Sequence, residues 1–194
     1  MFSAFIAIRC MTYALQPQKF QIGDGEFLEA ALLEAARYPS PSYIGTLEFP
    51  HDDYDNLLAE GRARTSANAA RLGPNHINTQ VVKGCPFTSD ELGRLCEGAV
   101  HKLLPLDAAA VVPGTDARPD LNLCGTSFDI KAAYARPGNT FSVSQYRAKK
   151  YDALVLVQLT ASNELRVWAC KCEPEAAGWE LRKGQPDFYL LKCT

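Results

Sequence analysis

The sequence predicts an α/β fold in which a central mixed β-sheet is flanked by helices. The first observation is the order of elements over residues 88–159, which reads helix, three strands, helix, strand. The second is the run ALVLVQL at residues 153–159, whose nearly continuous apolar character is typical of a strand buried on both faces. The third is the length of 194 residues, which is enough for one compact domain with a real core.

The first half of the chain predicts several elements but little chemistry. Residues 1–8 are apolar apart from one serine and predict a strand, and residues 43–49 predict another. Residues 26–37 and 55–72 predict helices that end before breaks containing Pro or Gly. This half is therefore expected to supply shape and contacts to the fold.

The elements of the second half are more sharply defined. Thr88 or Ser89 is expected to cap a helix over residues 90–104, with acids in its first turn. One face of this helix is predicted to be buried, because apolar residues recur at helical spacing: Leu92, Leu95, Cys96, Ala99, Val100 and Leu103. A short basic helix is expected at residues 144–151. Strands are expected at residues 108–112, 121–124, 127–133, 153–159, 165–172 and 188–192.

Composition indicates an ordinary globular protein, with 47% hydrophobic and 22% charged residues. We expect residues 1–86 to form an N-terminal segment, suited to dimerisation or DNA recognition, and residues 87–194 to form the core of one compact domain. The seven cysteines are odd in number and scattered, which favours free thiols and a cytoplasmic location. No segment approaches the length of a membrane span, so we expect no membrane partner.

Charge is distributed unevenly along the chain. Six basic residues and two acids lie between residues 117 and 150, so this stretch carries +4 while the formal net charge of the protein is −2. By itself such a stretch predicts only a solvated face. It gains interest because the two acids it surrounds, Asp120 and Asp129, are themselves placed in an informative pattern.

Asp120, Asp129 and Lys131 carry the chemical interest of the sequence. Side chains alternate in direction along a strand, so Asp129 and Lys131 share one face of the strand over residues 127–133. If the chain turns at Cys124-Gly125, paired residue numbers sum to 249 and Asp120 lies opposite Asp129. Gly125 can supply the positive φ that such a turn needs.

Two facing carboxylates repel each other, and a shared proton, Lys131 or a divalent cation would offset that repulsion. Carboxylate oxygens suit Mg²⁺, which binds few protein ligands and leaves positions for phosphate oxygens. Lys131 can help deprotonate an attacking water and offset charge in a phosphoryl transition state. The alternative is an ordinary hairpin with a Pro-Asp turn and a surface Asp/Lys pair.

Pro119-Asp120 followed by Asp129-Ile130-Lys131 resembles the signature of the PD-(D/E)XK, or restriction-endonuclease-like, nucleases. The similarity covers the order of elements over about seventy residues, from 88 to 159. It implies a restriction-endonuclease-like core in which Asp120, Asp129 and the Ile130 carbonyl bind Mg²⁺, with Mn²⁺ able to substitute, and Lys131 assists hydrolysis.

The resemblance also implies contributions from two helices. A glutamate on the helix before the core strands is expected to join the site, and helical periodicity does not choose between Glu91 and Glu97, of which we favour Glu97. A solvated helix glutamate is the alternative. On the basic helix, Gln145 is expected to complete the site. The neighbouring cations are expected to bind DNA phosphates: Arg147, Lys149 and Lys150.

These expectations favour a metal-dependent DNA endonuclease, with a type II restriction enzyme as the first choice and a junction-resolving, repair or phage nuclease as the second. A homodimer is expected by analogy with sequence-specific cutters. A hypothesis of another class is a non-catalytic module that has a nuclease-like fold and only binds nucleic acid. An interaction protein of unrelated fold would follow if the two aspartates proved to be far apart.

Overall fold

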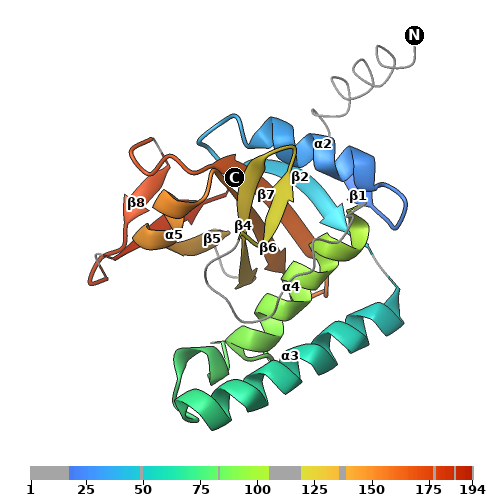
Figure 1. Cartoon of the computed structure of the whole chain (residues 1–194), viewed down its shortest axis with the longest axis vertical. Coiled ribbons are helices and arrows are strands. Elements are labelled where there is room, and N and C mark those ends of the chain that lie inside the picture. Colours follow the sequence, from blue (N-terminus) through green and yellow to red (C-terminus); the bar gives the residue numbers. More distant parts are fainter. Residues whose placement is uncertain are drawn as a thin grey trace.

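The computed structural model describes residues 18–48, 50–82, 84–104, 119–135, 139–176, 178–185 and 187–193. A six-stranded sheet forms the centre of the fold, and a second sheet of three strands packs on one of its faces (Figure 1). Helices pack on the opposite face, where they bury the larger of two hydrophobic clusters. The mixed α/β class expected from the sequence is confirmed.

The large sheet has the strand order β1-β2-β7-β6-β4-β3. Its strands are β1 (Gln18–Phe20), β2 (Ser42–Leu47), β3 (Leu121–Leu123), β4 (Thr126–Tyr134), β6 (Ala153–Leu159) and β7 (Leu165–Lys171). The pairs β4–β6 and β1–β2 are parallel, and the other three pairs are antiparallel. All seven residues of β6 are buried, as its apolar run predicts. Strands β1 and β2, from residues 1–86, lie in the same sheet as β4, from residues 87–194. The two segments therefore share one sheet.

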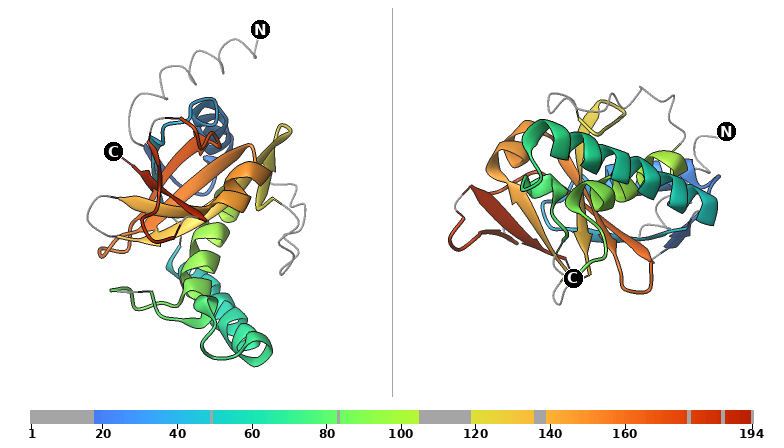
Figure 2. Two further views of the ribbon diagram at one scale, coloured as in Figure 1. Left: turned by 90° about the vertical axis from the view of Figure 1, so that its left-hand side faces the viewer. Right: turned by 90° about the horizontal axis from the view of Figure 1, so that it is seen from below.

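The described helices are α2 (Gly25–Ala35), α3 (His51–Leu72), α4 (Ser89–Leu103), α5 (Gln145–Lys150) and a 3₁₀ turn, η1 (Ile77–Thr79). Thr88 caps α4 in a reciprocal capping box with Glu91, which confirms the predicted start of this helix. Helix α3 packs against α4 and away from the sheet, as the two views of Figure 2 show. None of these described helices combines the length and the apolarity needed to cross a membrane.

Of the second sheet, only the strand over residues 188–192 was predicted. It consists of β5 (Thr140–Ser144), β9 (Phe188–Lys192) and β8 (Trp179–Leu181), in that order. Its inner face buries Phe141, Val143 and Leu191 against the large sheet. The third strand before α5 is thus β5, whereas residues 108–112, like residues 1–8, lie outside the described part of the chain. The short β1 was also missed, because three residues carry too little periodicity for a prediction.

The hairpin between β3 and β4 has the predicted turn. Cys124 and Gly125 both have positive φ, of 47° and 85°, which is the conformation of a two-residue type I′ turn. The paired residues are Leu121 with Phe128 and Leu123 with Thr126, which confirms the predicted register for these residues. The pairing does not extend to Asp120 and Asp129, because the N–H of Asp120 donates to the carbonyl of Phe128. This turn sets which residues of the two strands meet.

Glycines let α3 and α4 approach each other closely. A Cβ on Gly61 of α3 would lie 2.6 Å from the Cα of Glu91, a backbone atom that cannot move aside alone. On α4, a Cβ on Gly98 would lie 2.2 Å from a methyl group of Leu57. The two helices therefore cross at small residues, and the polar side chains beside the crossing are drawn together.

We predict that Gly61→Ala lowers the free energy of unfolding by about 1–3 kcal/mol, because the overpacking outweighs the helix propensity that alanine gains. The matched control is Gly93→Ala on α4, where the nearest atom is 4.0 Å away. That control should raise the free energy of unfolding by about 0.5–1 kcal/mol. Urea denaturation measures both values, and equal stability of the two variants would contradict this packing.

Candidate functional site

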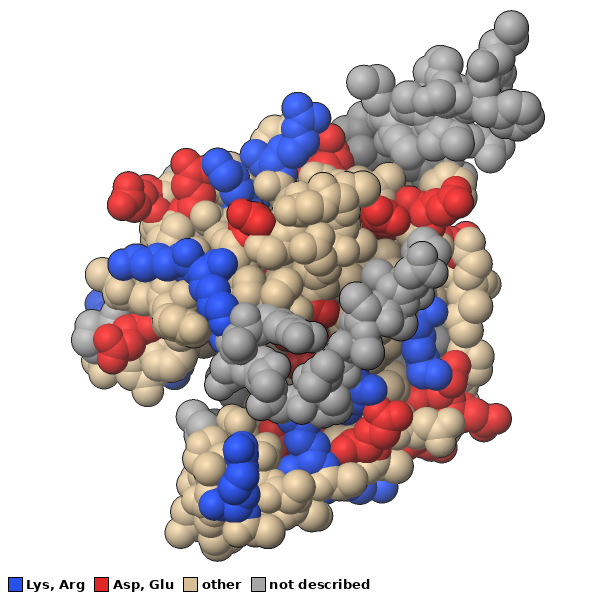
Figure 3. All heavy atoms as spheres, viewed as in Figure 1, with Lys and Arg blue, Asp and Glu red and all other residues tan. Residues whose placement is uncertain are grey.

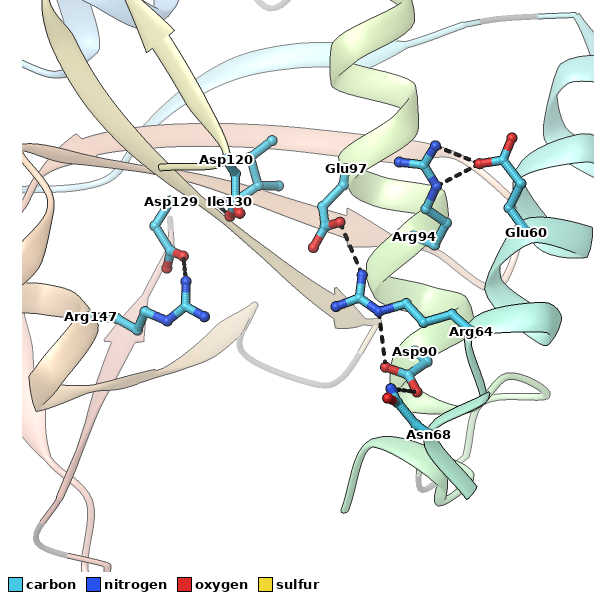
Figure 4. Close-up of polar contacts among 10 residues, drawn as sticks. All are labelled: Glu60, Arg64, Asn68, Asp90, Arg94, Glu97, Asp120, Asp129, Ile130 and Arg147. Atoms are coloured by element: carbon cyan, nitrogen blue, oxygen red, sulfur yellow. Dashed lines mark hydrogen bonds and ion pairs between the residues drawn. The ribbon is translucent and has the colours of Figure 1, made fainter. Parts of the chain in front are cut away.

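The β3–β4 hairpin holds Asp120 beside β4. Strand pairing ends at Leu121, and the backbone N–H of Asp120 donates to the carbonyl of Phe128 at 3.0 Å. The next backbone N–H of β4 on this side, that of Ile130, donates to the side chain of Asp120 instead of to a backbone carbonyl. Its acceptor is Oδ2, at 2.8 Å (Figure 4). The carboxylate of Asp120 is thereby fixed against the residue that follows Asp129.

Asp129 is completely buried, with 0% of its surface exposed. Its Oδ1 accepts a hydrogen bond from Nη1 of Arg147 at 2.8 Å. The Nζ of Lys131 lies 2.7 Å from its Oδ2 as an ion pair, but it is not aligned for a hydrogen bond, and Oδ2 accepts none from the described residues. A buried charge is costly unless it is paired, so the two cations stabilise the ionised carboxylate.

Arg147 has a partner within the protein that the sequence did not predict, since it pairs with Asp129. Its binding to DNA phosphates stays a prediction. Its guanidinium lies 5.7 Å from the ring centroid of Tyr151 and 3.4 Å from the hydroxyl of the same residue. Ser144 caps the short helix α5 and accepts the N–H of Arg147, which starts the turn that aims this side chain inward.

The other residues expected on this helix have different surroundings. Gln145 begins α5 and is half-buried, and its backbone N–H donates to the carbonyl of Asp187. Lys149 is exposed. The Nζ of Lys150 lies 5.3 Å from the ring centroid of Tyr146 and 5.1 Å from that of Tyr151. Basic side chains over α5 are visible in Figure 3.

The structure distinguishes the two candidate glutamates. Glu91 is occupied at the start of α4, where it accepts the N–H of Thr88 at 2.7 Å and pairs with Arg62. Glu97 lies two turns further along the helix, and its carboxylate extends toward the side where Asp120 and Asp129 lie (Figure 4). Of the two, only Glu97 is placed to act with the aspartates.

A cation from the first half of the chain reaches Glu97. Arg64 of α3 lies 3.5 Å from Glu97 and 3.5 Å from Asp90, which is itself buried and accepts a hydrogen bond from Asn68 at 2.8 Å. Sequence reasoning missed Arg64, because 33 residues separate it from Glu97. In the local sequence Arg62-Ala63-Arg64, nothing distinguishes Arg64 as the residue that reaches buried acids.

Two acids of this region, Asp120 and Glu97, have a raised pKa. Burial is the main reason that the pKa of Asp120 rises from 3.8 to about 7, and the charges of Glu97 and Asp129 raise it further. Burial also raises the pKa of Glu97, and Asp129 adds to this effect, while the nearby cations oppose it, Arg64 most of all. The charge of Asp129 therefore acts on both Asp120 and Glu97, which places the three carboxylates in one electrostatic environment beside β4.

The groups that could hold a cation are two carboxylates and a backbone carbonyl. In an extended strand the N–H and C=O of a residue point to the same edge, so the Ile130 carbonyl faces the side on which Asp120 receives the Ile130 N–H. Within the described part of the chain no three His, Cys, Asp or Glu residues gather closely enough to hold a metal ion. A cation at Asp120 and Asp129 would therefore keep several water ligands, as Mg²⁺ commonly does.

Comparison of the chain with protein-family models, with curated proteins and with solved structures finds no match. The geometry of the site therefore carries the functional argument.

We predict that Asp120→Asn raises the free energy of unfolding at about pH 8. The raised pKa means that the folded protein holds this proton more tightly than the unfolded chain, so the stabilisation is complete below about pH 4 and is lost as pH rises through about 7. Each pKa unit corresponds to about 1.36 kcal/mol, so the gain is at most a few kcal/mol and vanishes near pH 4.

The control for this measurement is Asp152→Asn. Hydrogen bonds from Ser127 lower the pKa of Asp152, so its stabilisation is present at neutral pH and is lost as pH falls. Denaturation from about pH 4 to 8 should give a difference from wild type that grows with pH for Asp120→Asn and one that stays nearly constant for Asp152→Asn, whose stabilisation is lost only below about pH 4. A pH-independent difference between Asp120→Asn and wild type would show that Asp120 has an ordinary pKa.

Proposed function

We propose that this protein is a metal-dependent DNA endonuclease, with type II restriction cleavage as the first choice of activity and junction-resolving, repair or phage nuclease activity as the second. The observation that carries the proposal is the placement of Asp120 and Asp129 at the end of one hairpin, with Lys131 paired to Asp129. The resemblance of these residues to the PD-(D/E)XK signature supports the same proposal. Mg²⁺ is the proposed cofactor, and Mn²⁺ can substitute.

Each proposed ligand has a defined position. Asp120, Asp129 and the Ile130 carbonyl would hold the cation, which when bound offsets the carboxylate charge and polarises the phosphodiester. Asp120 is oriented by the N–H of Ile130, so its free carboxylate oxygen is held in one direction. Lys131 lies beside these groups, where its ammonium can steer a water and stabilise charge that develops on the phosphate.

Glu97 supplies a carboxylate suited to proton transfer. Its raised pKa brings it toward the range in which a carboxyl group can both take and release a proton at neutral pH. Arg64 holds one of its oxygens, so the orientation of Glu97 depends on α3. Through Arg64, helix α3 links the N-terminal half of the chain, proposed for dimerisation or DNA recognition, to the orientation of Glu97.

A second candidate function is favoured by one observation. Asp129 already has two cations, Lys131 and Arg147, within 2.8 Å. If these pairs are permanent, the site takes no metal, and the protein would be a non-catalytic module that binds nucleic acid. The two functions make opposite predictions for metal binding and for cleavage.

We predict that plasmid, linear or branched DNA is cut in Mg²⁺ or Mn²⁺ and not in EDTA. Asp129→Asn and Lys131→Ala should each slow cutting by about 10²–10⁴-fold, because a metal ligand and a group acting on the reacting water are lost. Lys19→Ala is the matched control. Lys19 lies on β1, far from β4 in the sheet, and pairs there with Glu48.

Gel analysis of the products would separate restriction-like from junction-resolving cleavage. Cutting that survives EDTA, or an Asp129→Asn variant as active as Lys19→Ala, would contradict the proposal. DNA binding without cutting of any substrate would favour the non-catalytic module.

We also predict that Arg147→Gln increases the affinity for Mn²⁺ by about tenfold, because a charge-assisted hydrogen bond that competes for Asp129 Oδ1 is removed. Calorimetric titration without DNA measures this change directly. Arg182→Gln is the control, since Arg182 bonds to Ser142 on the second sheet. Absence of Mn²⁺ binding in both wild type and Arg147→Gln would rule out a metal site at Asp129.

A further inference from the structure

We infer that the corner where β5 passes into α5 is a stacking platform for single-stranded DNA, so that the substrate carries an unpaired strand next to the site. This inference rests on the proposed function for the nature of the substrate. It is carried by a different set of residues, the exposed aromatic rings of Tyr146 and Phe188 and the lysines of α5.

Two aromatic side chains are exposed at this corner. Tyr146 is 63% exposed and Phe188 is 36% exposed. Phe188 is paired with Ser144, the residue that caps α5, and the adjacent Asp187 accepts the backbone N–H of Gln145 at 2.8 Å. The two rings therefore extend from neighbouring positions in the backbone, at the junction of the second sheet and α5.

Lysines flank Tyr146 on the outer face of the helix. Successive residues turn by about 100°, which places Lys149 about 60° to one side of Tyr146 and Lys150 about 40° to the other. The Nζ of Lys150 lies 5.3 Å from the centroid of the Tyr146 ring. An exposed ring between two lysines suits a nucleic-acid strand, because the ring can stack on a base while the lysines contact the phosphates on either side of that base.

The inner face of the same helix contacts the proposed catalytic residues. Ala148 is packed in the core, and Arg147 reaches Asp129. The two faces of a helix such as α5 are separated by its diameter, about 10–12 Å with side chains. A strand stacked on Tyr146 would thus run close to the position where the phosphodiester is proposed to be cut.

The chemistry of the platform favours a single strand over a duplex. Bases in a duplex are stacked on one another, whereas an unpaired base offers a free face to an aromatic ring. Lysine contacts to phosphate add affinity that falls with salt and carries no sequence information. The proposed substrate class is accordingly DNA with a single-stranded arm, gap or flap.

The test is binding of a labelled oligo-dT strand and of a duplex, measured by fluorescence anisotropy in EDTA so that cleavage plays no part. Tyr146→Ala should weaken binding of the single strand by about 5- to 100-fold, and Phe188→Ala should weaken it less because its ring is more covered. Tyr146→Phe should retain binding, because the ring is kept. Tyr38→Ala is the matched control, since Tyr38 is 51% exposed but bonds to the acid Glu34.

Each outcome bears on the platform. Equal binding by Tyr146→Ala, Tyr38→Ala and wild type would overturn it, as would binding of duplex alone or of no DNA. Tyr146-dependent binding by a protein that cuts nothing would keep the platform and remove the proposed nuclease activity. If the protein cleaves duplex DNA but Tyr146→Ala leaves its affinity for single-stranded DNA unchanged, the nuclease proposal stands and the stacking platform is wrong.

Discussion

Asp129 is a carboxylate with no exposed surface on β4, and the pairing of its charge constrains the fold around it. An unpaired buried charge would cost several kcal/mol, so cations must reach it from nearby elements. Lys131 is available from the same face of β4, and Arg147 comes from α5. The crossover from β4 through β5 and α5 to the parallel strand β6 is what brings Arg147 to that position.

Helix α4 brings the third acid to the same region from the other side. Its close crossing with α3 at Gly61 places Arg64 between Asp90 and Glu97, so the orientation of Glu97 depends on a helix from the first half of the chain. Arg64 pairs with Asp90 and Glu97, Lys131 and Arg147 pair with Asp129, and Asp120 between them accepts a backbone N–H. A divalent cation bound to Asp129 would compete with Arg147, the side chain that donates to its Oδ1.

The local parts of this arrangement could be predicted from sequence. The β3–β4 register follows from the turn at Cys124 and Gly125, and the alternation of β4 places Asp129 and Lys131 on one face. The second sheet was predicted only in its strand over residues 188–192. Its strand β5 was missed although its polar residues alternate with the buried Phe141 and Val143, and such local patterns do not say which strands pair. The pairs Arg147–Asp129 and Arg64–Glu97 join residues 18 and 33 positions apart, and periodicity within single elements carries no information about such partners.

The most direct test of the central claim is a crystal structure of the protein grown with Mn²⁺, with anomalous scattering recorded to locate the ion. The account predicts an anomalous peak bonded to the carboxylates of Asp120 and Asp129, with the guanidinium of Arg147 moved away from Asp129 Oδ1. A structure with no peak at these carboxylates and with the Arg147–Asp129 pair intact would contradict it.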